Sequence, residues 1–286
     1  MPIASLTKIW TALVVVENAE LSEKVVVSKK AAYSEGSSIY LEEGEIVTVE
    51  TLLYGLMLRS GNDAAMALAE YVGGSEEGFV YLMNERARQA GLTRTVFQNP
   101  SGLNHPMHLS TAYDTARMLQ VAMENEIFAK IASTKTYKAD LKNTPSIVWQ
   151  NKQKLLFRDV GAISGKTGYT KVAGRTLATY FDRDDKRFVV VTLSESNDWQ
   201  VHSHLADMVD EQYEWKTVIP KGSYKTATHK IKVDEDVKLL LKKGEDEQLK
   251  HTLIIPRLVQ DKIAVWQIRL NNSQLHAFRT KYSEVN

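Results

Sequence analysis

Cysteine is absent from this chain of 286 residues. The sequence therefore excludes a thiolate nucleophile, a disulfide and a zinc site built on cysteine. An excess of charge of either sign is also absent, because 36 lysines and arginines oppose 35 aspartates and glutamates, for a net charge of +1. Such a balance gives no indication of a nucleic-acid partner, an anionic membrane surface or a uniformly charged substrate.

Long apolar runs are missing as well. Residues 1–8 lack the basic and apolar regions of a signal peptide, and the apolar run 9–16 is far too short to span a bilayer. Membrane attachment is thus not visible in the sequence. The composition, 43% hydrophobic and 25% charged, is that of a globular protein. It supports one large domain, or a main domain with a smaller one.

Helical periodicity dominates the first half of the chain. The segment 9–17 is apolar nearly all round, which predicts a helix buried at the centre of a domain. A tight turn is predicted at 59–62, between two further helices. The other predicted helices cover 49–58, 63–72, 76–90 and 110–123.

Strands are predicted beyond residue 135, the clearest being a hairpin of 175–181 and 187–193, followed by a helix over 199–215. A helical block combined with antiparallel strands predicts an α+β fold. Composition changes near 219–222, after which only short β-like runs follow. We therefore predict a main domain over 1–217 and a small all-β domain over 218–286. The predicted β-like runs of the second are 229–233, 237–241, 253–255 and 263–268.

The first chemical motif is Ser5-x-x-Lys8, at the N-terminal end of the predicted helix that covers 9–17. Positions i and i+3 share a helix face, so the Ser5 hydroxyl and the Lys8 amine can meet. A serine needs a base to become a nucleophile, and burial on an apolar helix lowers a lysine pKa enough to provide one. The plain alternative is a capping serine followed by an exposed lysine.

Two more motifs follow in order. Ser60-Gly61-Asn62 lies in the predicted turn, where a hydroxyl can relay a proton and an amide can hold a substrate carbonyl. Lys166-Thr167-Gly168 lies on a predicted strand, where a cation and a hydroxyl can bind a carboxylate and the glycine lets a substrate backbone lie against the strand. Taken singly, these are also explained by a capped turn and by a glycine-rich bulge.

Each motif occurs once, and together they form the S-x-x-K, S-x-N and K-T-G set of penicillin-binding serine enzymes. The chain resembles the D-alanyl-D-alanine carboxypeptidase family of low-molecular-mass penicillin-binding proteins. The likeness extends beyond the motifs over nearly the whole main domain, and more loosely into the β-rich part. The similar segments are 2–8 (PIASLTK), 56–65 (LMLRSGNDAA), 99–103 (NPSGL), 108–114 (HLSTAYD) and 165–174 (GKTGYTKVAG).

This resemblance implies roles for individual residues. Ser5 is the nucleophile that forms an acyl-enzyme, Lys8 its base, and Ser60 the proton relay toward the leaving D-alanine. Asn62 orients the substrate. Carboxylate binding is assigned to Lys166, Thr167 and Gly168 of the K-T-G segment, with Lys152 as a further basic residue near that carboxylate. The oxyanion hole uses the Ser5 N–H and one N–H just after Gly168, from Tyr169 or Thr170.

The resemblance also implies the setting. The substrate is a peptidoglycan stem peptide, β-lactams acylate the nucleophile, and the enzyme is extracytoplasmic, at the outer face of the cytoplasmic membrane in the cell envelope. No cofactor is implied. The pair His202 and His204 lacks a third ligand at a convincing spacing, so we predict no metal. Relatives carry a strand or two before the nucleophile, and Met1 lies so near Ser5 that we expect these N-terminal strands to be missing.

Three alternatives remain open. A class A β-lactamase shares the motifs but needs an acidic E-x-x-L-N segment, which is not found between Asp114 and Gly165. A DD-endopeptidase uses the same residues. A non-catalytic peptidoglycan-binding or scaffold protein has no need of Ser5, Lys8 and Lys166 together, and acylation by penicillin separates it from the enzyme.

Overall fold

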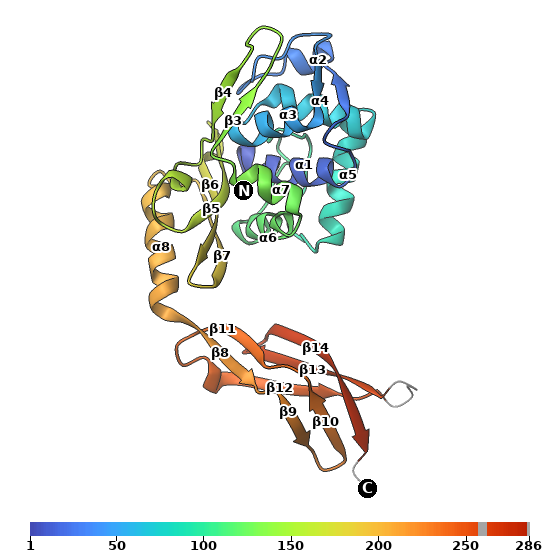
Figure 1. Cartoon of the computed structure of the whole chain (residues 1–286), viewed down its shortest axis with the longest axis vertical. Coiled ribbons are helices and arrows are strands. Elements are labelled where there is room, and N and C mark those ends of the chain that lie inside the picture. The colour runs from blue at the N-terminus through green and yellow to red at the C-terminus, as the bar shows by residue number, and fades with distance from the viewer. Residues whose placement is uncertain (257–261, 285–286) are drawn as a thin grey trace. The chain divides into compact units, whose positions relative to one another are not determined.

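The computed structural model describes residues 1–256 and 262–284. It divides into two compact units, Met1–Ala206 and Asp207–Asn286. The division falls inside helix α8 (Asp198–Gln212), before the predicted boundary after residue 217. The first unit combines a helical block with antiparallel strands and the second is rich in strands, which confirms the predicted α+β fold class (Figure 1).

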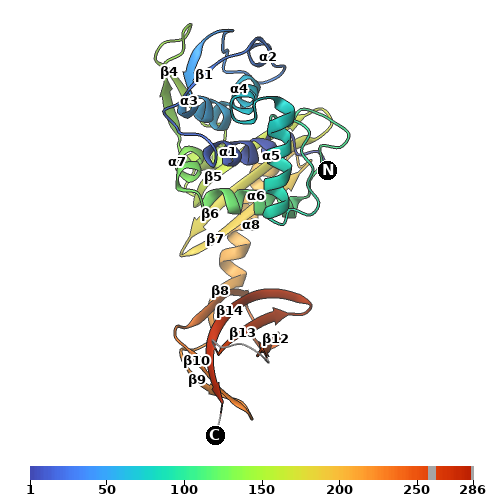
Figure 2. The ribbon, with the colours of Figure 1, turned by 90° about the vertical axis from the view of Figure 1, so that its right-hand side faces the viewer.

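Helix α1 (Thr7–Val16) runs through the centre of the helical block, and every one of its residues is buried (Figure 2). A short 3₁₀ turn, η1 (Ala4–Leu6), leads into it. The uniformly apolar sequence explains this central position, because no face of the helix tolerates water. The surrounding helices are α3 (Val49–Tyr54), α4 (Asn62–Gly73), α5 (Glu76–Gln89), α6 (Ala112–Met123) and α7 (Glu126–Ser133).

The main sheet has the order β5-β6-β7, with β5 (Ala162–Thr170), β6 (Gly174–Arg183) and β7 (Lys186–Leu193) all antiparallel. One side of the sheet contacts η1, α6 and α7. A second apolar cluster, which includes Phe181, Val190 and Ala206, joins the sheet to α8. The sheet is thus covered by helices on both sides, and β5 lies against the turn that opens α1 (Figures 1 and 2).

Smaller elements complete the first unit. Two strand pairs, a four-residue helix, a π-helical turn and a 3₁₀ turn connect the main helices and the sheet. The π-helical turn and the 3₁₀ turn border the site described below. The smaller elements are β1 (Lys24–Val26) with β2 (Ile46–Thr48), β3 (Thr136–Ala139) with β4 (Ile147–Gln150), the helix α2 (Lys29–Ala32), the π-helical turn η2 (Gly55–Arg59) and the 3₁₀ turn η3 (Lys154–Phe157).

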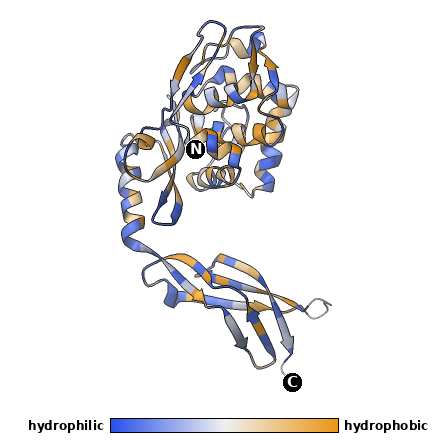
Figure 3. Ribbon diagram, in the orientation of Figure 1, coloured by the Kyte–Doolittle hydropathy of each residue, from blue (hydrophilic) through white to orange (hydrophobic). Residues whose placement is uncertain are grey.

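The second unit contains a five-stranded antiparallel sheet, β12-β13-β14-β10-β9, and the pair β11-β8. Its own apolar cluster is built on Ile219, Val233 and Ile268. Figure 3 shows apolar residues distributed through the strands of this unit as well as through the first. The elements are β8 (Tyr213–Ile219), β9 (Gly222–Lys225), β10 (His229–Val233), β11 (Val237–Lys242), η4 (Asp246–Gln248), β12 (Leu249–Ile254), β13 (Ile263–Leu270) and β14 (Ser273–Glu284).

The structure differs from the sequence prediction in the helical block, where α7 was not predicted and the predicted helix 49–58 is divided into α3 and η2. Three further differences lie in the later part of the chain. The last helix ends at Gln212, and 213–215 belong to strand β8, because Tyr213 and its neighbours pair with β11. Strands β9 and β14 were not predicted; their polar alternation becomes strand only through pairing with β10 and β13. The predicted strand at 253–255 begins earlier, at Leu249, since it pairs along β13.

Candidate active site

Ser5 lies in η1, one turn before the buried helix α1. Its Oγ is 3.1 Å from the Lys8 Nζ, so the predicted i, i+3 pair is formed. The preceding Ala4 has a φ of +48°, a conformation that costs free energy in a residue with a Cβ. Close packing holds it there, because a Cβ on Gly102 would lie 1.9 Å from the Ala4 carbonyl oxygen. The backbone at the nucleophile is therefore fixed from outside its own helix.

Lys8 is fully buried beneath Ser5. Besides the serine, its Nζ contacts the Asn62 Oδ1 at 2.7 Å and the Ser101 carbonyl oxygen at 2.6 Å. Burial, reinforced by the positive charge of Lys152, lowers the pKa of Lys8 to about 7, although Asp63 acts in the opposite direction. A large share of this lysine is consequently neutral near neutral pH, as a base requires.

Ser60 and Asn62 come from the junction between η2 and α4. Ser60 has left-handed backbone angles, φ 67° and ψ 32°, which end η2 and turn the chain into the next helix. The Asn62 amide holds Lys8 through its oxygen and donates through Nδ2 to the Glu35 carbonyl. The Asp63 carboxylate accepts a hydrogen bond from the Ile39 backbone N–H and so anchors the loop that contains Ile39. Both amide atoms of Asn62 are thus engaged by the protein.

The K-T-G segment lies on β5 beside the nucleophile. Lys166 is buried, its Nζ donates to the Thr167 carbonyl at 3.0 Å, and burial together with Lys8 and Lys152 lowers its pKa well below the usual value. Thr167 lines the cavity in front of it. A Cβ on Gly168 would lie 2.9 Å from the Ser5 backbone nitrogen, so only glycine lets the strand approach the nucleophile this closely.

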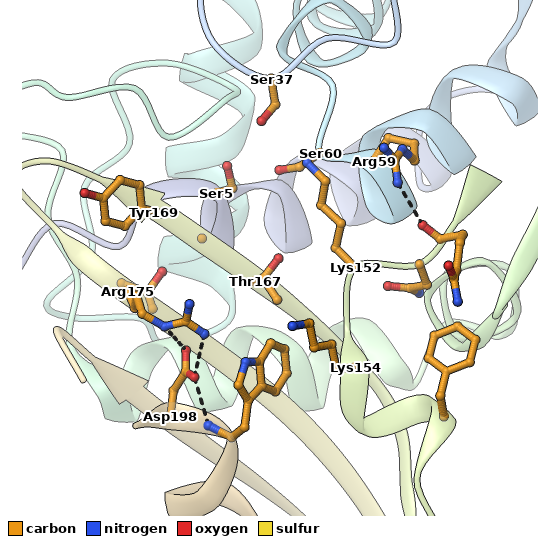
Figure 4. A pocket seen from close by; sticks show the side chains of 16 residues that line it. Ser5, Ser37, Arg59, Ser60, Lys152, Lys154, Thr167, Tyr169, Arg175 and Asp198 are labelled. Carbon is orange, nitrogen blue, oxygen red and sulfur yellow. Dashed lines mark hydrogen bonds and ion pairs between the residues drawn. The ribbon is translucent and has the colours of Figure 1, made fainter. Parts of the chain in front are cut away.

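These residues surround a cavity of about 810 Å³ (Figure 4). Ser5, Ser60, Thr167, Gly168 and Lys152 line it, whereas Lys8, Asn62 and Lys166 lie buried behind its wall. In Figure 4 the Lys152 side chain extends toward Ser60. The further lining residues are Ser37, Arg59, Gln150, Asn151, Lys154, Phe157, Tyr169, Arg175, Thr176, Asp198 and Trp199.

Histidines support the site without lining the cavity. The Gln98 N–H donates to His108 Nδ1, so Nε2 carries the proton and donates to the Thr7 hydroxyl at 2.8 Å. Burial lowers the pKa of His108 to about 4. His202 is also buried, between the hydroxyls of Thr179 and Thr192, and its pKa is lowered to about 3.

Sequence reasoning missed three contributors. The Ser101 carbonyl that holds Lys8 is a backbone atom and leaves no side-chain signature. Arg175 and Asp198 line the cavity as an ion pair, whereas the sequence predicts only that Arg175 begins a strand and that Asp198 comes just before a helix. One signal in the sequence could have indicated Arg175. It begins the first strand of the predicted hairpin, 175–181, which follows the K-T-G strand along the chain.

Comparison with known proteins agrees with this geometry. The sequence profile of the D-alanyl-D-alanine carboxypeptidase family matches residues 1–197. The chain belongs to this family. This match confirms the resemblance that was inferred from the three motifs. It also confirms that the chain is a serine hydrolase.

Individual relatives give the extent of the match. D-alanyl-D-alanine carboxypeptidase DacF of Bacillus subtilis is 36% identical over 264 residues, covering 85% of this chain and 67% of the relative. A D-alanyl-D-alanine carboxypeptidase of Mycobacterium tuberculosis is 36% identical over 194 residues, covering 67% of this chain and 66% of the relative. The chain thus spans about two thirds of the length of both.

A solved structure extends the likeness to the fold of the whole chain. The crystal structure of the D-alanyl-D-alanine carboxypeptidase DacD from Francisella tularensis matches with a TM-score of 0.77 at 23% identity, covering 99% of this chain and 86% of that one. At 23% identity, this likeness shows a shared fold and nothing about activity. Among the described residues of this carboxypeptidase-family chain, no helix has the length and apolarity to cross a membrane.

Proposed function

We propose that this chain is a serine-type D-Ala-D-Ala carboxypeptidase that removes the terminal D-alanine from peptidoglycan stem peptides through a Ser5 acyl-enzyme. Family membership supports the reaction class. The observation that carries the proposal is the contact of Ser5 Oγ with the buried Lys8 Nζ at 3.1 Å. The catalytic residues of the proposal all lie within the predicted main domain, 1–217, which we assign as the catalytic part.

The surroundings of Lys8 explain how it acts as a base. A neutral amine has two N–H groups and one lone pair. Two of its three partners, the Asn62 Oδ1 and the Ser101 carbonyl, can only accept hydrogen bonds. They take both N–H groups, so the lone pair is left for the Ser5 hydroxyl. Neutral Lys8 then removes the Ser5 proton while Ser5 Oγ attacks the carbonyl of the penultimate D-alanine.

The remaining residues act on charge and leaving group. The Ser5 N–H and an N–H from Tyr169 or Thr170 stabilise the oxyanion. Each donor lowers the free energy of the transition state by about 3 kcal/mol. Ser60 passes the proton to the departing amine, and Asn62 keeps Lys8 in place. Lys166, Thr167 and Lys152 supply hydrogen bonds and positive potential for the substrate carboxylate. Water then hydrolyses the acyl-enzyme and restores Ser5.

Partners and setting follow from this chemistry. The substrate lies outside the cytoplasm, so the proposed location is the cell envelope. A β-lactam acylates Ser5 and stays, because its leaving group remains tethered to the acyl group. A DD-endopeptidase would use the same residues on a cross-linked peptide, and it remains the alternative that a substrate assay decides.

The test is covalent labelling. The purified chain is incubated with a fluorescent penicillin, the labelled peptide is located by mass spectrometry, and Ser5→Ala is the control. We expect label on Ser5 in the unmodified chain and none in the variant. A correctly folded chain that takes no label contradicts the proposal and favours the peptidoglycan-binding scaffold. Release of D-alanine from a stem pentapeptide then distinguishes a carboxypeptidase from an endopeptidase.

A further inference from the structure

The five-stranded sheet of the second unit, drawn in Figure 1 with strands β9, β10, β12, β13 and β14, has two different faces. Side chains alternate from one face to the other along each strand. Ile231, Val233 and Ile268 point to the inner face, into the apolar cluster that also contains residues of β8 and β11. The residues between them project to the other side, which we call the outward face, and there Lys230 and Lys232 are exposed.

Basic side chains lie opposite one another on the outward face. Three cross-strand pairs each join two exposed cations: Lys225 with Lys230, Lys232 with Lys281, and Lys250 with Arg269. Like charges directly opposite each other destabilise a sheet. Of these side chains, only Lys232 has an ion-pair partner among the described residues, Asp234 at 3.0 Å. An anion held between the members of a pair would remove this repulsion.

Arg279 adds a further cation to the outward face, because it lies two residues before Lys281 on β14 and is exposed. The described residues of the five strands include one acid, Glu284, which alternates to the inner face together with Tyr282. The outward positions of these strands thus carry no acidic side chain where the structure describes them. The net charge of +1 for the whole chain conceals a strongly basic face.

The aromatic residues and the twist of the sheet restrict the partner. Tyr224, Trp266 and Phe278 belong to the inner cluster, and the outward positions of the described strands carry no aromatic ring. The face therefore lacks the stacking platform that single-stranded nucleic acid uses and the aromatic anchors of membrane interfaces. Neighbouring strands are rotated by about 20°, so the two edges of a five-stranded sheet face directions about 80° apart. A planar membrane cannot meet all these cations at once, whereas a flexible chain can follow them.

We propose that the outward face of the five-stranded sheet binds a flexible linear polyanion whose charges are phosphodiester groups. A phosphodiester has two free oxygens, and each can accept from one cation of an opposite pair. Strands lie about 4.8 Å apart, so a polymer that crosses them meets the three pairs and Arg279 in turn. The inference goes beyond the proposed function. None of these cations lines the active-site cavity, so the polymer leaves that cavity free.

The test measures binding of fluorescein-labelled poly(glycerol phosphate) to the full chain by fluorescence anisotropy at several salt concentrations. Binding should weaken as salt rises, because the cations displace counterions from the polymer. The variant Lys230→Gln/Arg279→Gln/Lys281→Gln should bind about 10-fold or more weakly at physiological salt. It should also lower the slope of log Kd against log salt concentration by about 2. Lys250→Gln/Arg269→Gln, at the other end of the face, should lower the slope by about 1.

The matched control is Lys238→Gln/Lys242→Gln/Lys243→Gln, which removes three exposed charges from the same unit. Lys238 and Lys242 lie on β11, outside the five-stranded sheet, and Lys243 follows them directly. This variant should keep the affinity and the slope of the unmodified chain. Circular dichroism checks that each variant is folded, and penicillin labelling of Ser5 should be the same in all of them.

Four results would overturn the inference. They are an unmodified chain that does not bind the polymer at physiological salt, an equal loss in the control variant, equal binding of polyglutamate, and binding to phosphatidylglycerol vesicles without binding to the polymer. The last result would assign the face to a membrane. Absence of label on Ser5 would contradict the proposed function alone, because polymer binding is measured without any reaction at the active site.

Discussion

At the scale of the residue, the chemistry depends on the charge of one buried lysine. Lys8 has a pKa of about 7 because burial and Lys152 both disfavour its ammonium form. Neutral Lys8 is the reactive form, so the rate of penicillin acylation should rise with pH through about 7 and then level. A pH–rate profile of Ser5 acylation measures this directly.

Lys152 sets part of that pKa through its charge. In Lys152→Gln one of the two influences that lower the pKa of Lys8 is removed, so the inflection of the acylation profile should move to higher pH. Lys171→Gln, which removes an exposed charge in the turn after β5, is the control and should leave the inflection in place. An unmoved inflection in Lys152→Gln would show that Lys152 acts on the substrate alone.

His108 links the site to the stability of the fold. Burial lowers the pKa of His108 from 6.5 to about 4. Between pH 6.5 and about 4, His108 is therefore protonated in the unfolded chain and stays neutral in the folded chain. The free energy of unfolding should therefore fall as pH falls from 6.5 to about 4, by up to about 1.4 kcal/mol per pH unit for this group. Urea denaturation across this range should give a shallower pH dependence for His108→Gln, and identical slopes for both proteins would contradict this account.

At the scale of the element, the contact between β5 and η1 decides whether a catalytic site exists. An alanine Cβ at 168 would lie 2.5 Å from Thr176 Oγ1 and 2.9 Å from the Ser5 nitrogen, so the strand would have to move away. We expect Gly168→Ala to slow acylation by 100-fold or more, of the order produced by losing one oxyanion donor.

Gly222→Ala is the matched control for this prediction. Gly222 is also a strand glycine, at the start of β9, and a Cβ there would meet nothing within 4 Å. Rates are measured with penicillin, and circular dichroism confirms that both variants are folded. If Gly168→Ala is acylated as fast as the unmodified chain, the close approach of strand and nucleophile is not required for reaction.

At the scale of the whole molecule, the two units have separate cores. The large apolar cluster around α1 and the residues of the cavity belong to Met1–Ala206, and the cluster of Ile219, Val233 and Ile268 belongs to the second unit. A fragment of residues 1–217, which keeps all of α8, should therefore fold and be acylated by penicillin within about threefold of the full chain. A folded fragment with no acylation would show that the β-rich unit takes part in the reaction.

The sequence by itself determined which residues share a local element. The apolar segment 9–17 had to be a central helix because no face of it tolerates water. The i, i+3 spacing at the start of that helix lets Lys8 reach Ser5, which lies in the 3₁₀ turn η1 just before it. The hairpin of β6 and β7 was equally local, since alternation and a short turn specify it. Local patterns also carried the three motifs from which the family was inferred, and the family profile bears this out.

Only the tertiary structure decided how these elements meet. The Ser101 carbonyl on Lys8, the approach of Gly168 to the Ser5 nitrogen, and the support of Arg175 by Asp198 join segments that are distant along the chain. The same holds for β14, which is a strand because β13 and β10 pair with it. Local propensity does not encode such contacts, because their free energy arises when the strands and helices of each unit close around that unit's core.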